Sequence, residues 1–560
     1  MRKLVLIVLS LLAFSASFSL LPSQYYPESV RLKLYEWFGA QSFTQLPAPI
    51  ETIVPDLIEN PCPPDHQGWR PAQVIDGVNV GESKVCKPDN PYAVAASVKG
   101  TNNVSHMTLM NSKLTPDSVV KGKDLDGDGD PDEIHIRLEV IELNGASPDR
   151  TDPVTAYDIA PGVQPGFWVF APKTFGMSTE NFESTYANNM LRAPSPAIRV
   201  EQGDKVKITL ENTHYLPHTI HFHGVDHPFL DENGEGNDGV PQVSEVPIMP
   251  GEKRTYEFQP RQPGSMMYHC HVQPHTHILM GLLGMFVIEE NRPDNWVQSI
   301  NIGAGHVRSP SVAVKEDYAE EYDLQYQAID KELNEIVGKY NDPRLIAKEM
   351  NRGYDITDAT GDYYMLNGRS FPYTIPESII VVEPDEKYKL RVTNASDHLV
   401  SLHMHGHKVK LTHYDGVEHN PVAQIQRDVV SISAAQRVDM ELNTTNDGLN
   451  NYGEGIWIMH DHDEKGVTTD GMHPGGGVTA IVYESFLNDN GLPKKQGVDW
   501  QKFFTPEFFQ RDIPVWVDFD VDKLFAEVEP TKTSIWKYIF MGILFGLSLV
   551  FLLAVFRSDY

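Results

Sequence analysis

Cysteine is scarce in this chain, which has three cysteines among 560 residues. Cys62 and Cys86 lie in a region rich in proline and glycine, and they can pair in an oxidising compartment. Cys270 is then left over, and an odd cysteine in a secreted protein needs a role other than a disulfide.

Basic side chains are outnumbered: 46 lysines and arginines face 77 aspartates and glutamates, for a formal charge of −31. Such an acidic surface disfavours nucleic acid and anionic lipid headgroups as partners. It favours solubility or cationic partners instead. We therefore expect no nucleic-acid partner.

Long apolar runs are few, and they lie at the two ends of the chain. Residues 1–19 have Arg2 and Lys3, an apolar stretch and then small residues, which is typical of a secretory signal peptide; an uncleaved anchor is the alternative. Tyr538 to Phe556 has no charge and is long enough to cross a bilayer as a helix, so residues 535–557 are predicted to be a transmembrane anchor. The rest of the chain would then lie outside the cytoplasm, on the outer side of the cell membrane.

Between the ends, the pattern of turns and short alternating strands predicts an all-β protein with two β-sandwich domains. We expect an N-terminal extension over residues 20–155, a first sandwich over 156–292 and a second over 360–487. Residues 293–359 are predicted to be a linker, with a helix near Tyr318 to Tyr340, and 488–534 a C-terminal segment.

An acidic loop interrupts the N-terminal extension. Carboxylates at alternate positions, with a glycine for the turn, resemble a calcium-binding loop. His135 stands where an EF-hand has its last glutamate, so the alternatives are a calcium loop between strands and a plain acidic turn. The candidate ligands are Asp124, Asp126, Asp128, Asp130 and Asp132.

Histidines are spaced two apart far more often than the composition explains. With 22 histidines, chance gives roughly one His-x-His spacing, whereas the chain has six. Side chains at positions i and i+2 of a strand lie on the same face, so each pair can offer two imidazoles to a metal. The pairs are His221/His223, His269/His271, His275/His277, His403/His405, His405/His407 and His460/His462.

Cys270 lies between His269 and His271 and faces the opposite side of their strand. With His275, Met280 and an upstream histidine, for which His218 is the best candidate, it forms a Cys-His-His set with an axial methionine. That set is typical of a blue-copper electron-transfer centre. His277 competes with His275, but only His275 leaves four residues before Met280.

These motifs resemble the multicopper oxidase family, including laccase-like two-domain oxidases of ammonia-oxidising archaea. The resemblance implies cupredoxin-like Greek-key domains and about four copper ions per chain. It implies a type 1 copper bound by His218, Cys270, His275 and Met280. It implies a type 2 copper bound by His221 and His403, and a type 3 pair bound by His223, His269, His271, His405, His460 and His462.

The second domain lacks the type 1 set, because Val400, Asp461, Gly466 and Gly471 occupy the expected positions. His398 is out of register and is expected to lie at the surface. The resemblance also implies acids beside the cluster, for which Asp238 and Glu464 are the candidates. Turn carboxylates are the alternative for both.

Two-domain members of the family are head-to-tail trimers, so we expect a homotrimer with each cluster between two chains. The expected reaction is oxidation of a reductant coupled to reduction of O2 to water. The reductant could be a phenol, an aromatic amine, a metal ion or a small nitrogen compound. A copper nitrite reductase is the nearest alternative, and a copper carrier or a metal-free surface protein would not need so many histidines.

Overall fold

The computed structural model describes residues 2–19, 73–75, 78–80, 118–146, 155–174, 191–292, 295, 297, 299–307, 318–494, 500–505 and 535–557. The predicted pair Cys62 and Cys86 lies outside the described residues. A two-stranded sheet is formed by β1 (Gln73–Ile75) and β2 (Val78–Val80).

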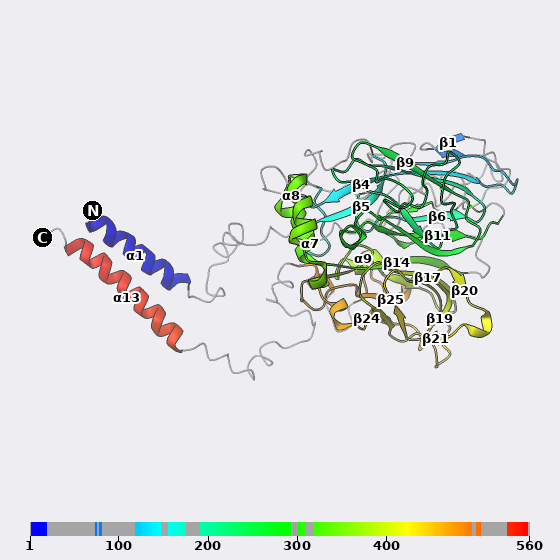
Figure 1. Ribbon diagram of the computed structural model, residues 1–560. Helices are drawn as coiled ribbons and strands as arrows, with labels where there is room; N and C mark the ends of the chain where they lie inside the picture. The colour runs from blue at the N-terminus through cyan, green and yellow to red at the C-terminus, as the bar shows by residue number, and fades with distance from the viewer. Residues whose placement is uncertain are drawn as a thin grey trace. The chain divides into compact units, whose positions relative to one another are not determined.

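The first sandwich consists of two sheets of short strands (Figure 1). One sheet has the order β3-β4-β7-β9, with β5 beside β4: β3 (Val119–Lys121), β4 (Glu133–Leu143), β5 (Phe167–Pro172), β7 (Lys205–Glu211) and β9 (Lys253–Phe258). The other has the order β12-β6-β11-β10-β8: β6 (Ala197–Glu201), β8 (His221–His223), β10 (Gly264–His269), β11 (Leu283–Glu289) and β12 (Ile300–Asn301).

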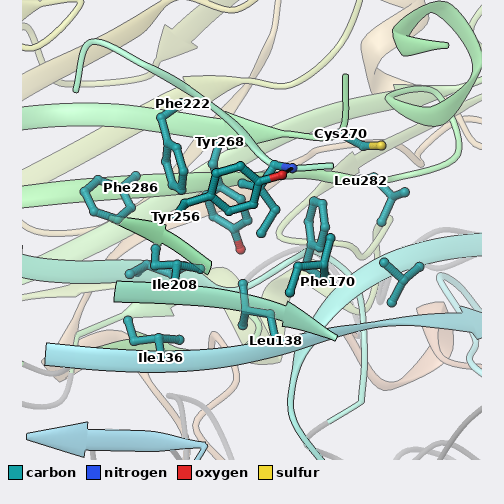
Figure 2. Close-up of a cluster of buried hydrophobic side chains, with 14 of the residues drawn as sticks. Ile136, Leu138, Phe170, Ile208, Phe222, Tyr256, Tyr268, Cys270, Leu282 and Phe286 are labelled. Atoms are coloured by element: carbon teal, nitrogen blue, oxygen red, sulfur yellow. Dashed lines mark hydrogen bonds between the residues drawn. The ribbon is translucent and has the colours of Figure 1, made fainter. Parts of the chain in front are cut away.

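Alternate side chains of both sheets meet in one apolar core, which Figure 2 shows. Ile136 and Ile208 come from the first sheet, and Phe222, Tyr268 and Phe286 come from the second. The thiol of Cys270 lies at the edge of this core and is fully buried. Packing between the two sheets therefore fixes the positions of the strand ends that carry the histidines.

The second sandwich repeats this plan, with more strands in one of its two sheets. One sheet has the order β13-β14-β17-β23-β19-β20, with β15 beside β14 and β21 beside β19: β13 (Gly305–His306), β14 (Glu320–Ile329), β15 (Tyr363–Leu366), β17 (Lys387–Asn394), β19 (Val409–Tyr414), β20 (Val417–Glu418), β21 (Gln426–Arg427) and β23 (Arg437–Asn443). The facing sheet has the order β16-β25-β24-β18-β22: β16 (Ile380–Val382), β18 (Val400–Met404), β22 (Val429–Ile432), β24 (Ile456–Asp461) and β25 (Thr479–Tyr483). The predicted all-β class with two cupredoxin-like sandwiches is confirmed.

Helices are short in this part of the chain. They are α6 (Pro274–His277), α7 (Lys331–Lys339), α8 (Pro343–Lys348), η4 (Glu349–Gly353), η5 (Ile356–Asp358), α9 (Thr374–Ser378), η6 (Pro421–Ala423), η7 (Glu464–Val467) and η8 (Glu484–Phe486). A further short helix, α10 (Trp500–Phe503), belongs to the other compact unit of the chain. The carboxylate of Asp330 caps α7 by accepting hydrogen bonds from two backbone amides of its first turn.

Two segments differ from their sequence-based interpretation. β3 and β4 belong to the first sandwich rather than to a separate extension, because β4 pairs with β7 along its length. The predicted helix near Tyr318 to Tyr340 is wrong in its first half, which is strand β14. Tyr322, Leu324 and Tyr326 alternate with polar residues and are buried in the second core, which is the period of a strand.

Buried ion pairs join the two sandwiches. Arg199 on β6 donates to Asp323 on β14 at 2.6 Å, and Arg391 on β17 donates to Glu289 on β11 at 3.1 Å. All four side chains are almost fully buried. Because a buried charge without its partner is strongly destabilising, these pairs make the contact between the sandwiches specific.

The terminal helices form a separate unit. α1 (Arg2–Ser19) lies beside α13 (Ile535–Arg557), and the hydroxyl of Ser10 donates to the carbonyl of Ser548 at 2.9 Å (Figure 1). Tyr538–Arg557 is long and apolar enough to cross a membrane.

Candidate metal centre

Three histidines of the first sandwich converge at the end of two paired strands. β8 and β10 are antiparallel, and their register places His221 opposite His269. His223 and His269 point their Nε2 atoms at each other across 3.0 Å. Ligand atoms of His221, His223 and His269 all lie within 4.8 Å of one another, which is the spacing needed to share a metal site.

The second sandwich builds the same arrangement on β18 and β24. Their register places His403 opposite His460, and the Nε2 atoms of His405 and His460 are 3.3 Å apart. Ligand atoms of His403, His405 and His460 again lie within 4.8 Å of one another. The two domains thus present equivalent groups of three imidazoles.

Hydrogen bonds to backbone carbonyls fix which nitrogen is free in four of these rings. The Nδ1 atoms of His221 and His403 donate to backbone carbonyls of Asp238 and Asp428, at 2.6 and 3.0 Å. Those of His269 and His460 donate to the carbonyl of the following residue, at 2.8 Å in both domains. Because Nδ1 carries the proton, Nε2 keeps its lone pair for a metal.

The remaining two predicted cluster ligands lie beside these groups. The ring of His271 is 5.2 Å from that of His221, and the ring of His462 is 5.5 Å from that of His403. Each domain therefore contributes four of the eight predicted imidazoles, as two strand pairs.

Burial keeps the buried imidazoles neutral. It lowers the pKa of His223 to about 4 and that of His269 to about 3, with the neighbouring histidines adding to the shift. Metal ligands must be deprotonated, and these rings are so at neutral pH.

The two groups are separate within one chain. No hydrogen bond or ring contact joins a histidine of the first group to one of the second in the part of the chain that the structure describes. The second group is also open to solvent, since the side chain of His462 is 53% exposed.

A different site surrounds Cys270. Its Sγ lies 3.6 Å from Nδ1 of His218 and 3.4 Å from Nδ1 of His277, and all three residues are buried. Met280 is fully buried in the same apolar cluster as Cys270. A thiolate, two imidazoles and a thioether form a donor set that suits copper.

His277, and not His275, lies at this site, which corrects the sequence-based choice. His275 is exposed, whereas His277 ends the short helix α6 and is buried with its ring 5.0 Å from that of His218. Counting residues to Met280 failed because the helical turn brings position i+7 from Cys270 back toward the thiol.

Burial raises the pKa of the Cys270 thiol to about 12. The free thiol is therefore protonated at neutral pH, so binding of a metal has to displace its proton.

The second sandwich has an aspartate at the position of Cys270. Asp461 lies opposite Leu402, directly after His460 in the strand, and its Oδ2 is 3.1 Å from Nε2 of His398. His398 was expected at the surface, but its side chain is only partly exposed and lies beside Asp461. Val400 is fully buried and offers no ligand atom.

The two predicted acids both lie beside cluster histidines. Oδ1 of Asp238 is 3.5 Å from Nδ1 of His221 and 3.0 Å from Nε2 of His227. Oε1 of Glu464 is 3.4 Å from Nδ1 of His462.

In the acidic loop, Asp124, Asp126 and Asp132 bring carboxylate oxygens within 4.8 Å of one another. Asp130 points inward instead, where its Oδ2 accepts a hydrogen bond from the backbone of Asn295 at 2.8 Å. Asp128 is half-buried, and its Oδ1 accepts a hydrogen bond from the backbone of Asp130.

Two polar residues near Cys270 were missed in the sequence. Nε2 of His218 is 2.8 Å from Nδ1 of His214, and Nε2 of His214 is 3.7 Å from Oε2 of Glu142. The available signal was a histidine four residues before His218, which no metal-site motif singles out.

Comparison with known proteins places both histidine-bearing domains in one family. Sequence profiles described as multicopper oxidase match residues 177–293 and 339–477. The iron transport multicopper oxidase FET3 of Gibberella zeae is 26% identical over 331 residues, covering 54% of this chain and 46% of that protein. The multicopper oxidase MmcO of Mycobacterium tuberculosis is 24% identical over 271 residues, covering 46% of this chain and 47% of that protein.

Among solved structures, the blue copper oxidase of Nitrosomonas europaea is 25% identical, with a TM-score of 0.46 over 68% of this chain and 95% of that one. The chain spans about half the length of the curated relatives it matches. The two family matches cover the strands that carry His221, His269, His403 and His460. The chain belongs to the multicopper oxidase family.

Proposed function

We propose that this protein is a laccase-like oxidase that takes single electrons from a reductant at the Cys270 site and delivers them to O2 at a three-copper cluster. The residues that would hold the electron-entry copper are His218, Cys270, His277 and Met280. When bound, the copper ions supply one-electron transfer at Cys270 and four-electron reduction of O2 to two waters at the cluster.

The repeated histidine geometry carries this proposal. His221 and His403 are equivalent in the two ladders, and so are His269 and His460. We assign His221 and His403 to a type 2 copper. A type 3 pair takes the other six, namely His223, His269, His271, His405, His460 and His462.

The backbone around Cys270 gives the electron its route. His269 and His271 are the chain neighbours of Cys270, so only a few covalent bonds separate the thiolate from two cluster ligands. Their side chains face away from the thiol because residues alternate along a strand. The two sites are thus distinct but directly connected.

Asp238 and Glu464 are placed to handle protons. Reduction of O2 to water consumes four protons, and a carboxyl group within reach of the cluster can hold and release them. Asp238 contacts His221 and is also hydrogen-bonded to His227, which places a second group that can carry a proton beside it.

The cluster is completed by a second copy of the chain in this proposal. Because the two histidine groups do not touch within one chain, a head-to-tail ring of three chains would bring a first-domain group to a second-domain group at each interface. Each chain then supplies half of two clusters.

Exposed apolar side chains flank both groups and support such an interface. The loop that carries Asp238 exposes Val243 and Val246, each by at least 70%, and the loop before Asp428 exposes Val422 by 93%. Large apolar side chains clustered on a surface are typical of contacts between subunits.

A copper nitrite reductase needs fewer ligands than this chain offers. A mononuclear second centre would leave His271, His460 and His462 without a role, although each lies within 6 Å, ring to ring, of another histidine of its group. Because both histidine pairs of each domain are complete, the arrangement favours the oxidase over the reductase.

The reductant is proposed to be a phenol, an aromatic amine, a metal ion such as Fe(II), or a small nitrogen compound. Oxygen uptake measured with one reductant of each class tests this, and four electrons should be consumed per O2 without release of peroxide. We place the enzyme outside the cytoplasm, anchored by α13 after removal of residues 1–19.

Replacing His277 tests the assignment of the electron-entry site. We expect His277→Ala to lose the blue absorption, because its Nδ1 faces the thiol of Cys270. His275→Ala is the matched control: it removes an exposed imidazole two residues away and should keep the colour. Visible absorption of the two copper-loaded variants separates them, and loss of colour in His275→Ala alone would restore the sequence-based choice.

We also propose that the acidic loop binds calcium, together with carboxylates buried beneath it. Glu201 and Asp204 are at most 3% exposed, and Oδ1 of Asp204 has no hydrogen-bond partner in the described chain. Burial is the main cause that raises the pKa of Asp130 to about 7 and that of Asp204 to about 8, with carboxylate neighbours adding to it. A divalent cation bound by hard oxygen ligands would relieve this cost.

The pH dependence of stability tests the calcium site. The folded pKa values of Asp130 and Asp204 lie above their ordinary value of 3.8, so the folded state holds protons that the unfolded state has lost. Their stabilising contribution therefore falls as the pH rises from about 4 to about 8. We expect added Ca²⁺ to raise the thermal midpoint more at pH 8 than at pH 5.

Comparing the thermal midpoint with and without Ca²⁺ at the same pH cancels the contribution of the histidines to the pH dependence of stability. Asp124→Asn should abolish the Ca²⁺ effect, whereas Asp447→Asn, which changes an exposed carboxylate in another turn, should keep it. An equal response in all three proteins would exclude this loop as the site.

A further inference from the structure

A line of buried polar side chains lies behind His218, on the side away from Cys270. His214 and Glu142 are only 1% and 6% exposed. A buried carboxylate is costly unless it is used as a hydrogen-bond acceptor. Glu142 accepts from Nε1 of Trp168 at 2.8 Å and from the hydroxyl of Tyr215.

The contacts of these side chains run in series from Cys270 through His218 and His214 to Glu142, and they fix which nitrogen of each ring carries the proton. His218 turns Nδ1 toward Sγ of Cys270, so its Nε2 carries the proton that is shared with Nδ1 of His214 across 2.8 Å. Nδ1 of His214 then accepts, which leaves the proton of that ring on Nε2. That atom is buried and has no hydrogen-bond partner among the described residues, and Oε2 of Glu142 lies 3.7 Å from it. These tautomers follow from the contacts of the rings.

Trp168 connects this series of polar side chains to the rest of the Cys270 site. Its ring lies edge-on to His214, His218 and His277, with centroids 4.9, 6.0 and 5.1 Å away. Its backbone N–H donates to the carbonyl of Met280 at 2.8 Å. The residue that binds Glu142 thus forms a wall of the Cys270 site.

The second sandwich provides an internal comparison. Asn212 and Asn394 make the same turn, since each side chain donates to two backbone carbonyls at 2.8 Å: one four residues ahead, and one more than 30 residues ahead, Ile248 for Asn212 and Ile432 for Asn394. From this alignment, Ser396 stands where the first domain has His214, and Val400 where it has His218.

The strand register extends the comparison to Glu142. β4 and β14 pair in parallel with the equivalent strands β7 and β17, Leu138 beside Leu210 and Leu324 beside Val392. Four residues further along, Glu142 is paired with Trp168 and Ala328 with Tyr364. The second sandwich, which has Asp461 in place of Cys270, therefore also lacks counterparts of the Glu142 carboxylate and the His214 imidazole.

We propose that Glu142, acting through His214, is a positioning residue for the electron-entry copper: His214 orients the ring of His218 through their hydrogen bond, and the carboxylate beside His214 makes that ring a stronger donor. This inference rests on the proposed function. A carboxylate at the far end of a hydrogen-bonded imidazole increases the basicity of the ligand and favours the oxidised ion. Glu142 therefore lowers the reduction potential of the copper bound at Cys270, which sets which reductants can feed the enzyme.

The test compares Glu142→Gln with the wild type in the full copper-loaded protein. Gln keeps the shape and accepts hydrogen bonds but removes the charge. We expect the blue absorption to persist and the equilibrium with a redox dye to move toward reduced copper by roughly tenfold. The electron paramagnetic resonance spectrum of the blue copper should change with it.

A matched control lies on the same strand. Glu139 is also fully buried, but its carboxylate binds Thr174, Lys173 and Thr213. Glu139→Gln should leave the dye equilibrium unchanged. If it moves the equilibrium as far as Glu142→Gln does, the effect is not specific and the proposal is wrong.

A second variant keeps the proposal testable if Glu142→Gln misfolds, and it tests whether Glu142 acts through His214. His214→Ser introduces the residue found at the equivalent position of the second sandwich, and it should move the equilibrium in the same direction. Because Glu142 acts through His214, Glu142→Gln should add nothing in the His214→Ser background. Additive shifts, or wild-type potentials in both single variants, overturn the inference. Absence of blue copper in the wild type would instead refute the proposed function.

Discussion

Cys270→Ser is expected to abolish both the blue absorption and essentially all turnover with every reductant. The serine hydroxyl is nearly the size of the thiol and fits the buried position, but it does not form the copper–thiolate bond that gives blue centres their colour and their electron transfer. The histidine groups lie on the opposite face of the strand and keep their geometry. Copper content should therefore fall only from about four to about three ions per chain.

The comparison with a buried neighbour controls for folding. Val272→Ala removes a buried side chain two residues after Cys270 and should keep colour and turnover. If Cys270→Ser retains turnover, electrons enter the cluster by another route. If it loses all copper, the thiolate holds the cluster together and the two sites are not distinct.

Two inactive variants are expected to restore activity when they are combined in one trimer. His221→Ala with His223→Ala destroys the first-domain half of each cluster, and His403→Ala with His405→Ala destroys the second-domain half. Each homotrimer should be inactive. Co-expression places an intact first domain against an intact second domain at some interfaces, since each cluster spans two chains.

Random assembly sets the size of the effect. An interface needs the intact first domain of one variant and the intact second domain of the other, so roughly one quarter of the interfaces and of the wild-type activity should return. The control is co-expression of His221→Ala/His223→Ala with a differently tagged copy of itself, which should stay inactive. A mixed trimer without activity would show that each cluster forms within one chain.

Much of the site could be predicted because strand periodicity is strict. His221 and His223 share a face in sequence and in structure, and the same rule places Cys270 on the face opposite His269. The equivalence of His221 and His403 also follows from the repeated motif. The expectation that each cluster lies between two chains, and so that the two groups are separate within one chain, came from the family resemblance and not from the spacing of the motif.

The choice between His275 and His277 shows where counting along the chain fails. Strand β10 ends at His269, just before Cys270, and Pro274 begins a short helix, so position i+5 from Cys270 turns outward and position i+7 turns inward. Backbone geometry, and not spacing, decides which imidazole reaches the thiol.

Glu142 and His214 lay beyond sequence reasoning for another reason. Glu142 is far from His218 in sequence, and only the parallel pairing of β4 with β7 brings the two strands together. The strand β14 was taken for helix because Tyr322 and Tyr326 fit both periods, whereas the alternation through Leu324 is the strand pattern that the structure follows.

The measurement that most directly tests the three-copper cluster is metal analysis of the purified protein, with copper counted per chain. One ion at Cys270 and three at the joined histidine groups predict about four copper ions per chain. A value of about two, reached with full blue absorption, would contradict the cluster and would mean that the paired imidazoles hold a single second copper.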